Sequence, residues 1–290
     1  MQQIHKKCEE LKTSDKDSLW LFTAPEYLIT ESQPNQPVLP ETKEYFIKKC
    51  MDLVAEFAPQ LFLLPGTILT KKNITSPQLP EKLEQVHKYY SNLLEKFPAL
   101  EDDEEFEKNK NNFKLKEIKN AKKVYLVRNS AMFFSLTAGE NSSLRREVID
   151  KKSPINECDI EDKTYNLFQV AKTHSKKHTK ANFNPIIELE HPFTKEKFNI
   201  GIEICRDHHN QILQAYLENE NTTPLLHFIL SSTISYVKDC LTGYYNFHID
   251  SLEENKMILR KKDQLNEKFS VEFEVCKLTY KNSTQYFASN

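Results

Sequence analysis

The chain has 290 residues, of which 39% are hydrophobic and 28% charged, and its formal net charge is −2. This balance predicts a globular protein without general attraction to nucleic acid or to anionic membranes. No apolar run approaches the ~18 residues of a membrane span. The polar start MQQIHKKCEELK lacks the apolar core of a signal peptide, so we expect a cytoplasmic protein.

Cysteine and glycine usage narrows the class further. The six cysteines, at positions 8, 50, 158, 205, 240 and 276, form no CxxC pair, and their wide spacing predicts reduced thiols. Only four glycines occur, at positions 66, 139, 201 and 243, so neither GxGxxG nor GxxxxGK[ST] can be written. The common glycine-rich phosphate loops are excluded, and we predict no cofactor and no metal.

The first part of the chain alternates helical and extended patterns. Residues 3–12 read as an amphipathic helix, and SLWLFT (18–23) is an apolar run typical of a buried strand, broken at Ala24-Pro25. After a loop over 31–40, the spacing predicts a helix over 41–58. QLFLLPGTIL (60–69) predicts a second buried strand that ends at Pro65-Gly66.

The rest of the chain begins with a long charged insertion and then becomes rich in strands. Residues 77–121 open on an amphipathic helix and continue as a charged tract, which predicts a solvated helix or loop. The remaining predicted elements are strand, turn and strand in 124–140, a buried segment in 144–154, a hairpin in 185–205, a strand in 223–235, and two further strands in TGYYNFHID and KFSVEFEVCKLTY. The pattern predicts one layered α/β domain over 1–290.

Three predicted strands end on side chains that together suit acyl transfer. These are Glu26, a lysine at 151 or 152, and Cys205. A thiol needs a base to remove its proton, and a desolvated glutamate can act as that base. A lysine, together with the amide of Arg206, can stabilise negative charge on a reacting oxygen. Each residue taken alone is more commonly a packed cysteine or a surface charge.

Six segments in order resemble the motifs of the nitrilase superfamily, the carbon–nitrogen hydrolases. The glutamate motif, the lysine motif and the cysteine motif of that family each have a counterpart, as do three intervening or following strands. The segments are APEY (24–27), LLPGTI (63–68), VRNSAMFF (127–134), VIDKKSP (148–154), GIEICRD (201–207) and LHFILSSTIS (226–235). Alignment of Ile149 with the tyrosine of the family's Y-x-K pattern makes Lys151 the match and Lys152 the alternative.

The resemblance implies a four-layer α-β-β-α sandwich and hydrolysis of a small amide, nitrile or carbamoyl substrate. It implies Glu26 as general base, Lys151 as oxyanion stabiliser and Cys205 as nucleophile. Members commonly pair into dimers, so a homodimer is a possible assembly. Many carry a further glutamate between the lysine and cysteine motifs, for which Glu157 and Glu161 are the candidates.

The sequence also departs from the family pattern. The family normally opens with a strand before the first helix, whereas this sequence begins in that helix. The usual arginine-phenylalanine-proline after the cysteine is replaced by His208-His209-Asn210. We therefore predict a distinct substrate pocket with Arg206, His208, His209 and Glu157 as substrate-binding residues.

Three alternatives remain open. The chain could be a nitrilase-like scaffold that binds a partner with little turnover, for which the 77–121 insertion is a candidate surface. It could be a cysteine protease in which Cys205 uses His208, His209 or a distant histidine. A metal site is the weakest alternative. His174 and His178 lack a nearby acidic or cysteine partner. Cys205, His208 and His209 form a Cys-His-His set, but three such neighbouring loop residues seldom complete a tetrahedral site.

Overall fold

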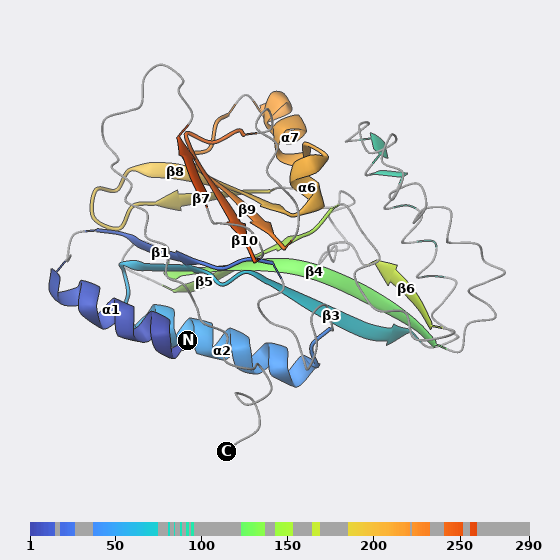
Figure 1. Cartoon of the computed structure of the whole chain (residues 1–290), viewed down its shortest axis with the longest axis horizontal. Coiled ribbons are helices and arrows are strands. Elements are labelled where there is room, and N and C mark those ends of the chain that lie inside the picture. The colour runs from blue at the N-terminus through green and yellow to red at the C-terminus, as the bar shows by residue number, and fades with distance from the viewer. Residues whose placement is uncertain are drawn as a thin grey trace.

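The structure is a computed structural model, and it describes the chain in several stretches. These are residues 1–14, 18–26, 37–74, 123–136, 143–152, 164–168, 185–220, 222–232, 241–251 and 256–259, with scattered positions between 81 and 95. Their elements form two open mixed β-sheets with few helices (Figure 1). The predicted α/β class is confirmed at this level.

The first sheet is centred on β4 (Lys123–Leu136). β1 (Trp20–Thr23) pairs in parallel with β2 (Leu61–Leu64), and β2 pairs antiparallel with β4. The other strands that pair with β4 are β3 (Thr67–Ile74), β5 (Leu144–Asp150) and β6 (Thr164–Phe168). Because β2 and β5 both run antiparallel to β4, strands β1, β2 and β5 point the same way.

Two sequence expectations for this sheet are wrong. β4 is continuous where a turn was expected within 124–140, because the polar residues Asn129 and Ser130 are buried in the strand and bonded to other side chains. β5 is not buried along its length, since its first five residues alternate between exposed and partly buried. The predicted strand that ends at Pro65 is confirmed as β2, and β3 begins two residues later.

The second sheet has the order β11-β10-β9-β8-β7. Its three central strands, β8 (Lys197–Ile204), β9 (Leu226–Ser231) and β10 (Tyr245–Asp250), are parallel. β7 (Ile186–Glu190) and β11 (Lys256–Leu259) flank them in antiparallel pairing. The expected hairpin in 185–205 and the strands in 223–235 and TGYYNFHID are confirmed.

Alternating side chains build two separate cores around the first sheet. Along β2, Phe62 and Leu64 pack toward the second sheet, whereas Leu61 and Leu63 pack with the residues of α1 (Gln2–Ser14) and α2 (Pro40–Glu56). α2 begins with a proline, whose fixed φ suits the first turn of a helix. Figure 1 shows α1 and α2 on the face of the first sheet that is turned away from the second sheet.

The second sheet shares its inner core with the first and carries two helices near its other face. Ile200, Ile202 and Ile204 of β8 belong to the core between the sheets. α6 (Arg206–His209) and α7 (Ile212–Glu220) follow β8 (Figure 1). The side chain of Leu213 in α7 lies over Gly201, on the face of β8 opposite to the isoleucines.

Some predictions fall outside the described residues. They concern Glu157, Glu161, His174, His178, the strand in KFSVEFEVCKLTY, and all of 77–121 except its scattered positions. Within the described stretches, no helix has the length and apolarity required to cross a membrane.

Candidate active site

The parallel strands of the second sheet bring their carboxyl ends to one edge. Ile204 of β8 pairs with Leu230 of β9, and Ser231 pairs with Asp250 of β10. Cys205 follows β8 at this edge. In open α/β sheets, ligands bind beyond the carboxyl ends of parallel strands, so Cys205 occupies a position suited to chemistry.

The backbone at Cys205 has an uncommon conformation. Its φ is 51° and its ψ is −110°, in a region that side chains other than glycine seldom adopt. Its N–H donates to the Leu230 carbonyl at 2.8 Å, and its own carbonyl accepts the N–H of His208 at 3.0 Å. These bonds hold a sharp turn from β8 into α6, in which Cys205 is buried with 5% of its surface exposed.

Glu26 comes from the segment after β1 and is buried, with 1% of its surface exposed. Its Oε1 accepts one hydrogen bond from Lys151 Nζ at 2.9 Å and another from Asn129 Nδ2 at 2.9 Å. Lys151 directly follows β5, and its own N–H donates to the Asn129 carbonyl at 2.9 Å. The first sheet therefore joins the predicted glutamate to the predicted lysine in a buried ion pair.

Hydrogen bonds connect the segment around Cys205 to this pair along two routes. The N–H of Glu26 donates to the Ser231 carbonyl at 3.3 Å, and Ser231 directly follows Leu230, which accepts the N–H of Cys205. On the other side, the Asp207 carboxylate accepts the N–H of Lys152 with both oxygens at 2.9 Å. Glu26, Lys151 and Cys205 thus belong to one local assembly across the two sheets.

The two lysines have different partners. Lys151 Nζ binds Glu26, whereas Lys152 Nζ donates to the carbonyl of Asp150 at 2.6 Å. The Asp150 carboxylate accepts the Ser130 hydroxyl at 2.5 Å and lies 3.6 Å from Arg128 Nε. Lys151 is therefore the lysine whose ammonium group meets the glutamate.

The residues predicted to bind substrate are placed very differently from one another. Arg206 is partly buried, and His209 is exposed. His208 is fully buried, and its Nδ1 lies 2.8 Å from Glu203 Oε2. Glu157 lies outside the described residues. Substrate binding by these four residues stays a prediction.

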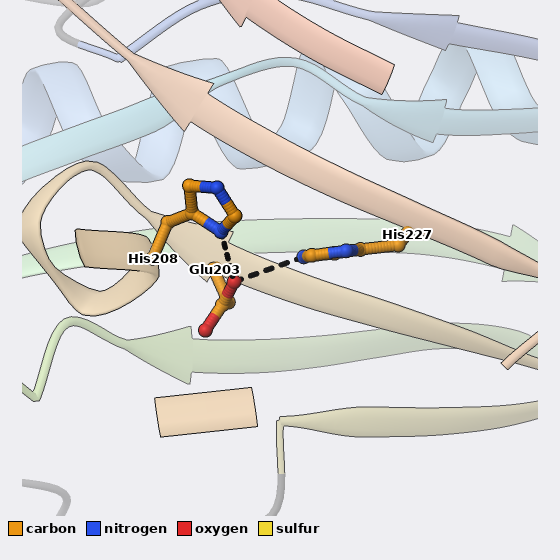
Figure 2. Close-up of side chains that lie close together, drawn as sticks. All are labelled: Glu203, His208 and His227. Atoms are coloured by element: carbon orange, nitrogen blue, oxygen red, sulfur yellow. Dashed lines mark hydrogen bonds and ion pairs between the residues drawn. The ribbon is translucent and has the colours of Figure 1, made fainter. Parts of the chain in front are cut away.

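Glu203 forms the centre of a second buried polar cluster (Figure 2). Its Oε2 meets His208 Nδ1 at 2.8 Å and His227 Nε2 at 2.9 Å, and its Oε1 accepts the N–H of Leu213 at 2.8 Å. Burial raises the pKa of Glu203, but the hydrogen bonds from the two histidines outweigh that effect and lower the pKa to about 2. Glu203 is therefore a carboxylate despite its burial.

The Glu203 cluster also contains the atom types of a metal site. Two imidazole nitrogens and one carboxylate oxygen lie within 4.8 Å of one another. The described residues supply three such ligands, whereas structural zinc sites usually have four. Both nitrogens already lie at hydrogen-bond distance from the carboxylate, so a hydrogen-bonded network accounts for the geometry.

A further hydroxyl, imidazole and carboxylate meet at the ends of β9 and β10. The Ser231 hydroxyl lies 2.9 Å from His248 Nε2 and donates a short hydrogen bond to Asp250. In a serine-hydrolase triad the carboxylate binds the imidazole nitrogen that faces away from the serine. Here Asp250 instead contacts the hydroxyl and lies 3.9 Å from the same Nε2. This group is not arranged to activate Ser231.

Sequence reasoning missed several residues that organise the site. Asn129 and Asp207 lie inside the quoted segments VRNSAMFF and GIEICRD, so their motifs were a usable signal. Glu203 precedes Cys205 by two residues within an apolar strand, where a lone charge indicates a buried partner. His227 gave no comparable signal, because it meets Glu203 only through the pairing of β8 with β9.

Comparison of the chain with protein-family models, with curated proteins and with solved structures gives no significant match.

Proposed function

We propose that this protein is a thiol-dependent hydrolase of a non-peptide carbon–nitrogen bond in a small amide, nitrile or carbamoyl compound. Cys205 is the nucleophile, Glu26 the general base and Lys151 the stabiliser of the developing oxyanion. The proposal includes membership of a divergent branch of the nitrilase superfamily and its four-layer arrangement of helices outside two facing sheets.

One observation carries the proposal: three strand ends distant in sequence converge with complementary chemistry. The Glu26 carboxylate and the Lys151 ammonium are paired at 2.9 Å, and both are buried. Cys205 is held next to them by the adjacent carbonyls of Leu230 and Ser231. A buried ion pair adds little to net stability compared with apolar packing, so its presence beside a strained cysteine supports a catalytic role.

For an amide substrate, the first half-reaction forms a thioester. Glu26 accepts the Cys205 proton while the sulfur bonds to the substrate carbonyl carbon. The carbonyl electrons move onto oxygen, where the Lys151 ammonium opposes the negative charge, with the Arg206 amide as a second donor. The intermediate collapses as the carbon–nitrogen bond breaks, and Glu26 gives its proton to the departing amine.

The second half-reaction returns the enzyme to its starting state. Glu26 accepts a proton from water, whose oxygen bonds to the thioester carbon. The oxyanion is stabilised as before, the carbon–sulfur bond breaks, and the thiolate takes the proton back from Glu26. The products are a carboxylic acid and an amine, and the single carboxylate acts in turn as base and acid.

Trapping of the thioester tests the proposal. The full chain is incubated with a panel of small amides, nitriles and carbamoyl compounds, and the modified peptide is identified by mass spectrometry. We expect acylation of Cys205, and C205A should abolish turnover while the free energy of unfolding changes by about 1 kcal/mol or less. C50A is the matched control, because Cys50 is a buried thiol in α2.

Two outcomes would contradict the assignment. Turnover that survives in C205A would remove Cys205 from the mechanism. A folded protein with no acylation across the panel would favour the nitrilase-like scaffold, in which the same assembly serves binding alone.

A further inference from the structure

We propose that Glu203, with His208 and His227, is a positioning device that holds the strained turn at Cys205. The proposal rests on the proposed function in assigning Cys205 a catalytic role. The three side chains come from different elements around the nucleophile: Glu203 from β8, His208 from α6 and His227 from β9 (Figure 2).

Two members of the cluster flank Cys205 in the sequence. Glu203 precedes Cys205 by two residues, and His208 follows it by three. The Glu203–His208 contact of 2.8 Å therefore closes a short loop with Cys205 inside it. The backbone bond from His208 N–H to the Cys205 carbonyl lies within the same loop. A strained backbone conformation persists only when several surrounding contacts hold it in place. The Glu203–His208 contact is one such restraint on Cys205.

His227 and α7 anchor the same carboxylate from outside the loop. His227 Nε2 contacts Glu203 Oε2 at 2.9 Å, and the N–H of Leu213, near the start of α7, donates to Oε1 at 2.8 Å. His227 is itself held, because its Nδ1 lies 3.2 Å from Asn246 Oδ1. The position of Glu203 is therefore fixed before any substrate binds.

Asn246 and Thr242 hold the ring of His227 in place. Asn246 Oδ1 accepts the N–H of Gly243 at 2.9 Å, and its Nδ2 donates to the Gly243 carbonyl at 2.8 Å. Asn246 Oδ1 therefore faces His227 Nδ1, and the backbone N–H of Thr242 also points at this nitrogen at 3.4 Å.

The first test measures backbone strain at position 205 and needs no substrate. Glycine adopts positive φ without the penalty that alanine meets there, so C205G should melt at a higher temperature than C205A. In an E203Q background the turn is released, and the difference between C205G and C205A should shrink or reverse. An unchanged difference in the two backgrounds would show that Glu203 does not hold the turn.

E203Q is a suitable test substitution, because a glutamine side chain has nearly the size of glutamate but fewer hydrogen-bond acceptors. The carboxylate accepts on both oxygens, whereas a glutamine amide has one oxygen and an NH₂ group that cannot accept. In E203Q either the histidines or the Leu213 N–H must lose a partner. If E203Q fails to fold, the same C205G and C205A comparison is made in H208A, which removes the side-chain contact that closes the loop.

The second test uses turnover and rescue. H208A should lower kcat on the order of 10-fold to 100-fold with little change in KM, because misplacement of a nucleophile affects the reaction step. H208N places an amide N–H near the position of Nδ1 and should restore part of the loss. L53A, a core change in α2, should lower the melting temperature without this loss of kcat. Equal kcat in H208N and H208A would overturn the positioning role.

The two proposals fail in distinguishable ways. Absence of turnover in the parent protein would remove the proposed function, while the melting comparison at position 205 would still report on the turn. Elemental analysis of the purified full chain supplies a further test. One equivalent of zinc that E203Q fails to retain would make the cluster a metal site and would overturn positioning by hydrogen bonds.

Discussion

Two buried glutamates, Glu26 and Glu203, lie near the candidate nucleophile Cys205, and they differ in their partners. Glu26 follows a strand in the first sheet, and its partners are a lysine and an asparagine. Glu203 lies within a strand of the second sheet, and its partners are two histidines and a backbone N–H. Burial alone does not separate a reactive carboxylate from a supporting one.

The partners show the difference between the two sites. Lys151 and Asn129 both bind the same Glu26 oxygen, Oε1. Glu203 uses both oxygens to join β8, β9, α6 and the start of α7. We infer that Glu26 takes part in proton transfer, while Glu203 holds the turn that presents Cys205. Substitutions that perturb one of these carboxylates should therefore differ in their effects from substitutions that perturb the other.

The largest expected effect is loss of the Glu26–Lys151 pair. E26Q or K151M alone should destabilise the fold by about 3–5 kcal/mol, because each leaves one buried charge without its partner. Either change should also lower kcat on the order of 100-fold or more. The double variant E26Q/K151M should be less destabilised than the sum of the single variants. Urea denaturation of all four proteins measures the coupling, and additive losses would contradict a buried ion pair.

The next effect is the acid sensitivity contributed by Glu203. Its pKa falls from 4.5 in the ordinary state to about 2 in the fold, so the unfolded chain takes up this proton first as pH decreases. The stabilisation is complete above the unfolded pKa and is lost as pH falls toward the folded value. Between about pH 4.5 and pH 2, the parent should lose roughly 3 kcal/mol more than E203Q. If the unfolding free energies of the parent and of E203Q fell in parallel as the pH decreases, the proposed contribution of Glu203 to acid sensitivity would be contradicted.

The sequence predicted the strands that carry the candidate catalytic residues better than the side-chain contacts that support them. Apolar runs located β1, β2, β8 and β9, and each predicted catalytic residue lies just beyond a strand end. The turn expected within 124–140 is absent from β4, where the polar Asn129 and Ser130 lie in the strand and bond to buried side chains. The Glu203–His227 contact depends on strand register across 24 positions, which no local pattern encodes.

The smallest effects are expected from substitution of two glycines, Gly66 and Gly201. Gly66 lies against the residue before Glu26, and Gly201 precedes Glu203 by two residues. A Cβ at Gly66 would lie 2.2 Å from the Pro25 carbonyl oxygen, immediately before Glu26, and φ at Gly66 is +76°. A Cβ at Gly201, two residues before Glu203, would meet the end of the Leu213 side chain at 2.6 Å. A backbone carbonyl in a tight segment cannot move aside, whereas a leucine can change rotamer.

G66A should therefore cost about 2–3 kcal/mol of unfolding free energy, and G201A about 1 kcal/mol. G66A should also lower kcat more than G201A, because the clash displaces the segment that holds the proposed base. Thermal melts and kinetics on the two variants measure both differences. A larger loss of kcat in G201A would mean that the turn at Cys205 tolerates less movement than the base does, and would reverse the ranking of the two carboxylates.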